Sequence, residues 1–179
     1  MKGQTKASLI FVLLLILAGA STRLVPHPYN FTALSAIALF SGARFGKTAW
    51  AFLVPVIAMF LTDLVIGFHG FFLMLSVYSS FLAIVVIGIF LGGKEKAMNV
   101  VGASLASSVL FYLITNFSTW PGSPVYPQNL SGLIQSYIAG IPFFSNQVIG
   151  DLFYCTLLFG GYALAIRRFP SLASVHASK

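Results

Sequence analysis

Two carboxylates lie inside long apolar segments of this chain and are the residues best placed to do chemistry. Asp63 stands near the end of one segment, and Asp151 stands about eight residues, or about 12 Å, into another. An ionisable side chain within a membrane span costs roughly 2.5–3.5 kcal/mol on insertion scales, so it needs a partner or a function. For Asp63 we expect an ion pair with Arg23 or His69. No Lys or Arg lies at the depth of Asp151, so this carboxyl either joins a structural polar network or serves a ligand or a proton in a wet cavity.

Three polar residues near the ends of apolar segments are further candidates for ligand contacts. Asn116 ends one segment and Trp120 follows one helical turn later, which places an amide beside a stacking ring or, alternatively, a helix cap beside an interfacial aromatic. His27 stands between Pro26 and Pro28, whose rings stiffen the backbone. It either coordinates a metal or a metal-centred cofactor, or is an ordinary polar loop residue.

The familiar catalytic motifs are missing from the sequence. The chain has no Gly-x-Ser-x-Gly, no His-Glu-x-x-His and no phosphate-binding glycine loop. Its one cysteine, Cys155, lies in an apolar segment and allows neither an intrachain disulfide nor a zinc cluster. It is either a small buried hydrophobic residue or a thiolate ligand for a metal-containing substrate. We therefore predict a protein that is not an enzyme and that carries no cofactor and no metal.

The composition indicates that lipid is the solvent of this chain. Of its 179 residues, 58% are hydrophobic and 7% are charged, whereas roughly 25% of the residues of a soluble domain are charged. The formal charge of +7 comes largely from pairs of basic residues between apolar segments, with no basic stripe among exposed aromatics. This pattern argues against nucleic-acid binding and predicts an all-α, polytopic membrane helix bundle.

Six apolar segments predict six spans in a single membrane domain that covers residues 1–179. The expected spans are 7–25, 29–43, 48–67, 71–91, 97–116 and 143–166, with an outer loop at 117–142. The first segment is either a retained span or a cleaved signal peptide that ends at Ala18-Gly19-Ala20. The second is short for a span, at about 22 Å.

Two segments carry distinctive patterns of small or apolar residues. In 97–116 small residues recur four apart, as in Gly102 and Ala106, which predicts close helix contacts and a central position in the bundle. From Leu130 to Ile141 apolar residues recur at helical spacing. That pattern predicts a short interfacial helix before the last span.

The basic residues predict the orientation. With the N-terminus inside, nine of the ten Lys and Arg residues fall on the inner side and Arg23 alone falls outside. Both termini are then cytoplasmic. Most of the remaining polar residues gather toward the outer half, so a pocket would open outward. The candidate ligand contacts are His27, Asn30, Asp63, Asn116, Trp120, Tyr126, Asn146 and Asp151.

Several segments together resemble a family of small bacterial membrane proteins of unassigned function, over roughly residues 20–168. They are Arg23-x-x-Pro-His-Pro-x-Asn-Phe-Thr32, Thr62-Asp-x-x-x-Gly67, Thr115-Asn-Phe-x-x-Trp120, Tyr126-Pro127, Ile141-Pro-Phe-Phe144 and Gly150-Asp151. That family looks like the substrate-binding S components of energy-coupling factor (ECF) transporters.

The resemblance implies a six-span protein of the bacterial inner membrane with an outward-facing site for a vitamin or a related micronutrient. It implies a separate coupling subunit and two ATPases as partners. It also implies a small-residue contact with the coupling subunit, for which Ala38-x-x-x-Gly42 is the nearest match. The His-rich amino terminus of the nickel and cobalt members is missing, which argues against a simple metal-ion substrate.

The leading expectation for function is capture of a small organic, vitamin-like micronutrient from the outer side. Asn116, Trp120, Asn146 and Asp151 would line the site, and the loop at 117–142 would act as a lid. One alternative is a solitary proton-coupled or passive carrier that uses Asp151 as its titrating group. Another is a structural or assembly protein of the membrane, whose polar groups only hold helices together.

Overall fold

The computed structural model describes residues 2–168, and for residues 2–9, 11, 12 and 15 it describes the backbone. All regular structure in this part of the chain is helical. The elements are α1 (Lys2–Leu24), α2 (Leu34–Phe45), α3 (Ala49–Ile66), α4 (Phe71–Leu91), α5 (Ala97–Thr119), α6 (Leu130–Cys155), the π-helical turn η1 (Thr156–Gly160) and α7 (Gly161–Arg168).

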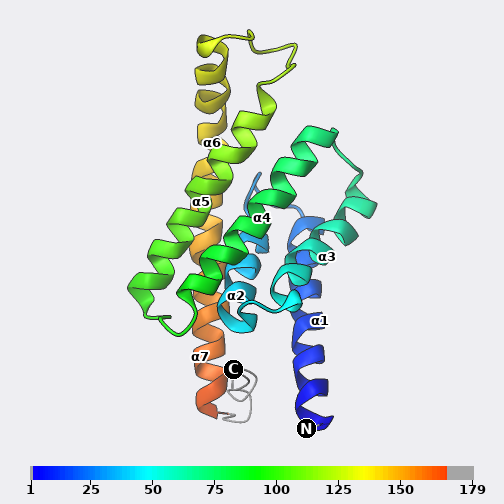
Figure 1. The fold of residues 1–179 in the computed structure, drawn as a ribbon, viewed down its shortest axis with the longest axis vertical. Coiled ribbons are helices and arrows are strands. Elements are labelled where there is room, and N and C mark those ends of the chain that lie inside the picture. The colour runs from blue at the N-terminus through cyan, green and yellow to red at the C-terminus, as the bar shows by residue number, and fades with distance from the viewer. Residues whose placement is uncertain (1, 169–179) are drawn as a thin grey trace.

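The six helical passages alternate in direction along one axis of the molecule (Figure 1). The start of α1, the α2–α3 turn, the α4–α5 turn and the end of α7 lie toward one end, which we call the basic end. The loops at 25–33, 67–70 and 120–129 lie toward the other, which we call the loop end. The turns and helix termini of the basic end carry Arg44, Lys47, Lys94, Lys96, Arg167 and Arg168.

Four described helices are long and apolar enough to cross a membrane. They are Ala49–Ile66, Phe71–Leu91, Ala97–Thr119 and the continuous helix Leu130–Arg168. These four agree with the predicted all-α membrane fold. The helix α2 is also apolar, but its 12 residues extend only about 18 Å, less than the roughly 30 Å of a bilayer core.

This short helix α2 lies at the centre of the bundle. Every residue from Leu34 to Ala43 is buried, and α2 contacts α1, α3, α4, α5 and α6. A helix that is apolar on all faces is stable when protein surrounds it, so α2 does not need to match the thickness of the bilayer. It begins at Leu34 rather than at about residue 29, because Pro26 and Pro28 hold the preceding residues in a loop.

The helices α2 and α4 approach closely because Gly42 of α2 packs against Gly88 of α4. A Cβ at Gly42 would overlap the carbonyl oxygen of Val85, and a Cβ at Gly88 would overlap that of Leu39. Small residues permit such contacts between membrane helices. Ala38, one turn before Gly42, is fully buried. We expected Ala38 and Gly42 to contact a coupling subunit. The structure corrects this, because both are used inside the chain and leave no exposed surface for a partner.

The prediction of a central fifth helix is wrong, because α2 occupies that position. On α5 the small residues that are buried are Ser104, Ser107 and Ser108, whereas Gly102 and Ala106 are exposed. A Cβ at Gly102 would meet no atom within 4 Å. The small-residue pattern covers two faces of α5, and only the serine face packs against its neighbours.

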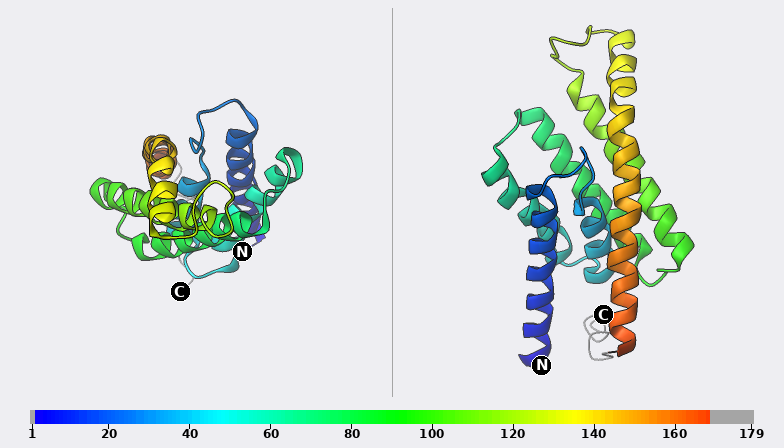
Figure 2. Two further views of the ribbon diagram at one scale, coloured as in Figure 1. Left: turned by 90° about the horizontal axis from the view of Figure 1, so that it is seen from above. Right: turned by 180° about the vertical axis from the view of Figure 1, so that it is seen from behind.

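The segment Leu130–Arg168 is one continuous helix, which the right view of Figure 2 shows along its whole length. Asn129 caps its start by accepting a hydrogen bond from the backbone N–H of Gly132 at 3.0 Å. Pro142 removes one backbone donor inside α6 without ending the helix. The prediction of a separate interfacial helix is therefore wrong, because those residues are the first part of this continuous helix. The loop before the helix covers residues 120–129 instead of the predicted 117–142. At 39 residues the joined helix extends about 58 Å, past the core of a bilayer.

Gly42→Ala and Gly88→Ala should each lower the stability of the protein by about 1–3 kcal/mol, as overpacked substitutions do. The added methyl group meets backbone atoms, so α2 and α4 have to separate to admit it. The measurement is thermal unfolding of the purified variants in one mild detergent.

Gly102→Ala is the matched control for these two variants, because its Cβ enters open space on a described helix. It should melt with the wild type or slightly above it, since Ala favours a helix over Gly. Equal melting of all three variants would contradict the close contact between α2 and α4.

Candidate functional site

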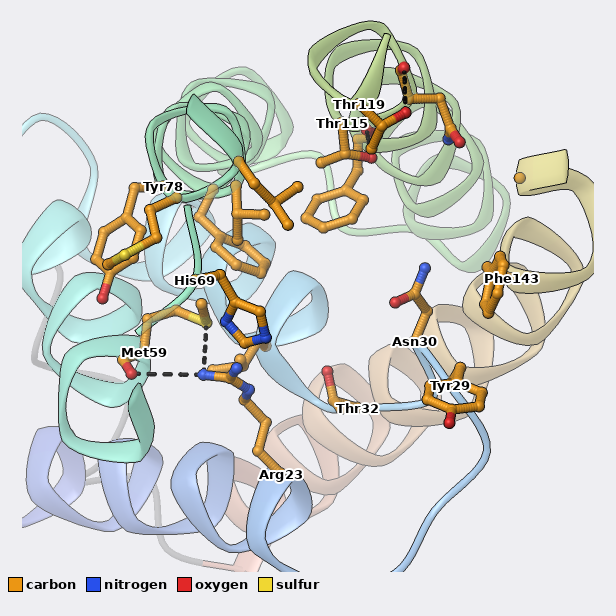
Figure 3. A pocket seen from close by; sticks show the side chains of 18 of the residues that line it. Arg23, Tyr29, Asn30, Thr32, Met59, His69, Tyr78, Thr115, Thr119 and Phe143 are labelled. Atoms are coloured by element: carbon orange, nitrogen blue, oxygen red, sulfur yellow. Dashed lines mark hydrogen bonds between the residues drawn. The ribbon is translucent and has the colours of Figure 1, made fainter. Parts of the chain in front are cut away.

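A cavity of about 640 Å³ lies between the helices toward the loop end. Its walls come from α3, α4, α5 and α6, from the end of α1 and from the loop at 25–33 (Figure 3). Sites for small organic ligands typically occupy about 300–1,000 Å³. The cavity therefore has room for a small organic molecule.

The lining of the cavity combines apolar walls with a few polar groups. The apolar side chains include Met59, Met74, Phe81, Phe111, Ala139 and Phe143. The polar side chains include Arg23, His27, Asn30, Asp63, His69 and Asn116. Such a combination is typical of small-molecule sites, in which the polar groups fix the orientation of the ligand.

An ion pair forms part of the cavity wall. The guanidinium of Arg23, at the end of α1, donates to Asp63 Oδ1 of α3 at 2.8 Å, and the Asp63 side chain is 4% exposed. The same nitrogen, Nη1, donates to the hydroxyl of Thr62 and lies 3.5 Å from the carbonyl oxygen of Met59. The predicted pairing of Asp63 with Arg23 is confirmed.

A phenol from a third helix completes the pairing of Asp63. Tyr78 on α4 donates to the second carboxylate oxygen, Oδ2, at 2.7 Å. Charge-assisted hydrogen bonds of this kind are roughly twice as strong as neutral ones. One buried carboxylate thus joins α1, α3 and α4, and fixes three walls of the cavity relative to one another.

The loop between α1 and α2 brings His27 and Asn30 to the cavity. The hydroxyl of Thr22 accepts a hydrogen bond from the backbone N–H of Ala33 at 3.1 Å, which ties the end of the loop to α1. His27 Nδ1 lies 2.8 Å from the carbonyl oxygen of Pro28. Asn30 has a φ of 62°, a left-handed conformation that Asn adopts more readily than most residues. This turn carries both predicted side chains to one site.

The opposite wall is built from α5 and α6. Asn116 donates from its side chain to the carbonyl oxygen of Tyr112 at 2.9 Å. It packs against Gly140, where any Cβ would overlap the Asn116 amide. Thr115 and Thr119 reach the cavity from the same helix as Asn116. Because Gly140 has no side chain, it leaves room for the amide of Asn116 at the cavity wall.

The loop at 120–129 contributes Tyr126 to the cavity, but Trp120 does not line it. The indole N–H of Trp120 donates to the carbonyl oxygen of Pro127 at 2.8 Å. The side chain of Gln128 donates to the carbonyl oxygens of Trp120 and Tyr126 at 3.0 and 2.9 Å. In place of the expected stacking surface, Trp120 is thus part of a hydrogen-bonded clamp that closes the loop on itself.

Asp151 and Asn146 also lie outside the cavity lining. Asp151 is 1% exposed and accepts a hydrogen bond at Oδ2 from Ser108 of α5 at 2.7 Å. Ser35 of α2 and Gln147 of α6 lie beside this carboxyl, but Oδ1 has no hydrogen-bond partner of good geometry among the described residues. Asp151 therefore belongs to a buried polar cluster between three helices.

The structure brings together five of the eight predicted ligand contacts. They are His27, Asn30, Asp63, Asn116 and Tyr126. Sequence reasoning missed Tyr78, whose phenol completes the ion-pair network, and the threonines of α5. A phenol within the apolar segment 71–91 was the available signal, because a buried Tyr hydroxyl usually has a hydrogen-bond partner.

Asp63→Asn should cost about 3–5 kcal/mol of stability, because it leaves the guanidinium of Arg23 without its carboxylate. The double variant Arg23→Gln, Asp63→Asn removes both charges and should recover most of that loss. Thermal unfolding of the two single variants and the double variant in one detergent measures the coupling. Additive losses would contradict a direct pair.

Comparison with known proteins leaves the function open and assigns the family. No curated protein and no solved structure matches the chain. Residues 3–172 match the sequence profile of a family described as a family of unknown function, DUF6580. Because the match covers nearly the whole chain, this protein belongs to the DUF6580 family.

Proposed function

We propose that this protein is the substrate-binding subunit of a membrane uptake system that resembles the ECF transporters. It captures a small organic, vitamin-like micronutrient on the outer side of the bacterial inner membrane. The observation that carries this proposal is the cavity of about 640 Å³ at the loop end, with its apolar walls and its few fixed polar groups.

The direction in which the cavity faces follows from the distribution of charge. Cytoplasmic segments of membrane proteins carry the excess of Lys and Arg, and the turns of the basic end hold Arg44, Lys47, Lys94 and Lys96. At the loop end Arg23 is the one Lys or Arg of the described chain. The loop end then faces the outside. With α1 and α2 counted as spans, the chain crosses six times and both termini are cytoplasmic.

The walls of the cavity fit an amphipathic molecule. Phe81 and Phe111 form a ring pair with centroids 5.4 Å apart, and Tyr29 and Phe143 form another at 5.6 Å. These rings offer packing surface for an apolar or aromatic body. The amide of Asn116 and the hydroxyls of α5 offer hydrogen bonds along one wall.

In this proposal, partner proteins are required to deliver the ligand into the cell. The sequence has no phosphate-binding glycine loop, so the energy for uptake would come from a coupling subunit and ATPases of the ECF type. Since Ala38 is fully buried and Gly42 is packed against α4, the contact with a coupling subunit would use another surface of the bundle.

Ala139→Trp should remove at least nine-tenths of the small molecule that the wild type retains, because the indole fills the cavity beside Phe143. Ile138→Trp is the matched control, since Ile138 directly precedes Ala139 in α6, is 60% exposed and does not line the cavity. The measurement is mass spectrometry of small molecules released from equal amounts of monodisperse protein in mild detergent. An empty wild type, or equal retention by both variants, would contradict capture at this site.

One observation favours a second candidate function, that of a solitary proton-coupled carrier. Asp151 is buried in the bundle, and its Oδ1 has no hydrogen-bond partner of good geometry in the described chain. Carboxyl groups buried within membrane spans form the proton relays of pumps and transporters. Its separation from the cavity lining favours the first candidate, and equally fits a protein whose polar groups only hold helices together.

Asp151→Asn should leave ligand retention within about twofold of the wild type, because Asp151 does not line the cavity. It should lower the stability by about 1 kcal/mol or less, because the amide oxygen of Asn can still accept the hydrogen bond from Ser108. The measurements are ligand retention, thermal unfolding and uptake by proteoliposomes under an imposed pH gradient. Gradient-driven uptake by the wild type that disappears in Asp151→Asn would instead establish the carrier.

A further inference from the structure

The anionic and the cationic side chain that line the cavity differ in how many of their polar atoms already have hydrogen-bond partners. Among its lining residues the one carboxylate is Asp63, and both of its oxygens are engaged, Oδ1 by Arg23 and Oδ2 by Tyr78. The lining cation, Arg23, is engaged at one nitrogen, because the bonds to Asp63, Thr62 and Met59 all meet Nη1. No hydrogen bond joins Nε or Nη2 of Arg23 to the part of the chain that the structure describes.

The unengaged edge of Arg23 has the geometry of an anion receptor. Nε–H and one N–H of Nη2 point side by side, and this fork matches the two oxygens of a carboxylate or phosphate. The Arg23 side chain lines the cavity and is 16% exposed. Figure 3 shows its guanidinium directed into the cavity, as is the ring of His69.

The ion pair with Asp63 fixes the direction of this fork. Nη1 is held by acceptors on α3, so the planar guanidinium cannot rotate its Nε–Nη2 edge away without breaking the Asp63 bond. A preorganised donor loses little side-chain entropy when it binds its ligand. Asp63 is therefore a positioning residue for the fork, and its own oxygens are not free for a cationic ligand.

We infer that the ligand of this cavity is an organic oxyanion, whose carboxylate or phosphate is bound by the Nε–Nη2 edge of Arg23. This inference rests on the proposed function, since it names the chemical class of the captured molecule. His69, which also lines the cavity, adds a further ring N–H. The ring pairs of Phe81 with Phe111 and of Tyr29 with Phe143 pack against the apolar body that carries the anion.

A neutral or cationic molecule fits this site less well. A neutral ligand in the same position, such as an amide, offers one uncharged carbonyl oxygen to the two N–H donors in place of two anionic oxygens, and charge-assisted hydrogen bonds are roughly twice as strong as neutral ones. A cation meets the Arg23 charge and no free carboxylate. Phospholipid headgroups share the oxyanion chemistry, so the experiment has to separate a soluble acid from a lipid.

The test compares acids with their amides on the wild type. The probe pairs are octanoate with octanamide, hydrocinnamate with hydrocinnamide, and indoleacetate with indoleacetamide, titrated calorimetrically onto delipidated protein in mild detergent. At least one acid should bind roughly ten- to a hundredfold more tightly than its amide, as two charge-assisted hydrogen bonds allow. Failure of every acid to bind, or equal binding of acid and amide, overturns the inference.

Arg23→Lys separates ligand recognition from structural pairing. The ammonium keeps a donor for Asp63 and Thr62 but has no second edge. The variant should remain monodisperse, bind the amide as the wild type does, and lose the preference for the acid to within about threefold. The double variant Arg23→Gln, Asp63→Asn should lose it as well. An acid preference that survives in both variants overturns the role of Arg23.

Mass spectrometry of the molecule that co-purifies with the undelipidated protein separates this inference from the proposed function. A soluble carboxylate or phosphate supports both. A phospholipid that the acids displace supports the oxyanion site and overturns micronutrient capture. A stoichiometric soluble ligand that is neutral or cationic supports capture and overturns the oxyanion site.

Discussion

The buried ion pair between Arg23 and Asp63 is the interaction on which the loop end of this protein depends. It holds the end of α1 against α3, and Tyr78 adds α4 through the second oxygen of the same carboxylate. A charge in the membrane region is costly without a partner, and removal of one partner from a buried pair costs several kcal/mol. The pair therefore has to stay intact for the helices to meet as they do. The same requirement fixes the Arg23 guanidinium in one orientation at the cavity, so one residue serves both the fold and the proposed ligand site.

The helix α2 explains why the cavity lies at one end of the bundle. Gly42 and Gly88 let α2 and α4 touch through their backbones. At the basic end Arg44 pairs with Glu95 at 3.3 Å and lies 4.2 Å from the centre of the Tyr162 ring, which joins α2 to the α4–α5 turn and to α7. The short α2 begins at Leu34 and does not reach the far tip of the loop end (Figure 1). Close packing at the basic end and the absence of α2 beyond Leu34 leave the space that the loop residues surround.

Features of the sequence that depend on local chemistry predicted the structure well, and features that depend on neighbours did not. Apolar length predicted the long spans, and the cost of a charge in lipid predicted a partner for Asp63. For Asp151 the sequence left a buried polar network and a ligand or proton role open, and the structure shows a hydrogen bond with Ser108 away from the cavity lining. The predicted ligand contact at Trp120 is not seen, because its indole N–H donates to the carbonyl oxygen of Pro127 within the loop. The conformation of that loop does not follow from any periodic pattern in the sequence. Small-residue spacing on α5 predicted contact without telling which face would be in contact.

The most direct test of this account is an experimental structure of the protein in a lipid bilayer disc, with the co-purified molecule retained. We predict an intact Arg23–Asp63 pair, an open cavity at the loop end and density for a small organic acid whose oxygens meet the Nε–Nη2 edge of Arg23. A cavity closed by its own side chains, or an Arg23 whose guanidinium turns away from Asp63 to the bilayer surface, would contradict it.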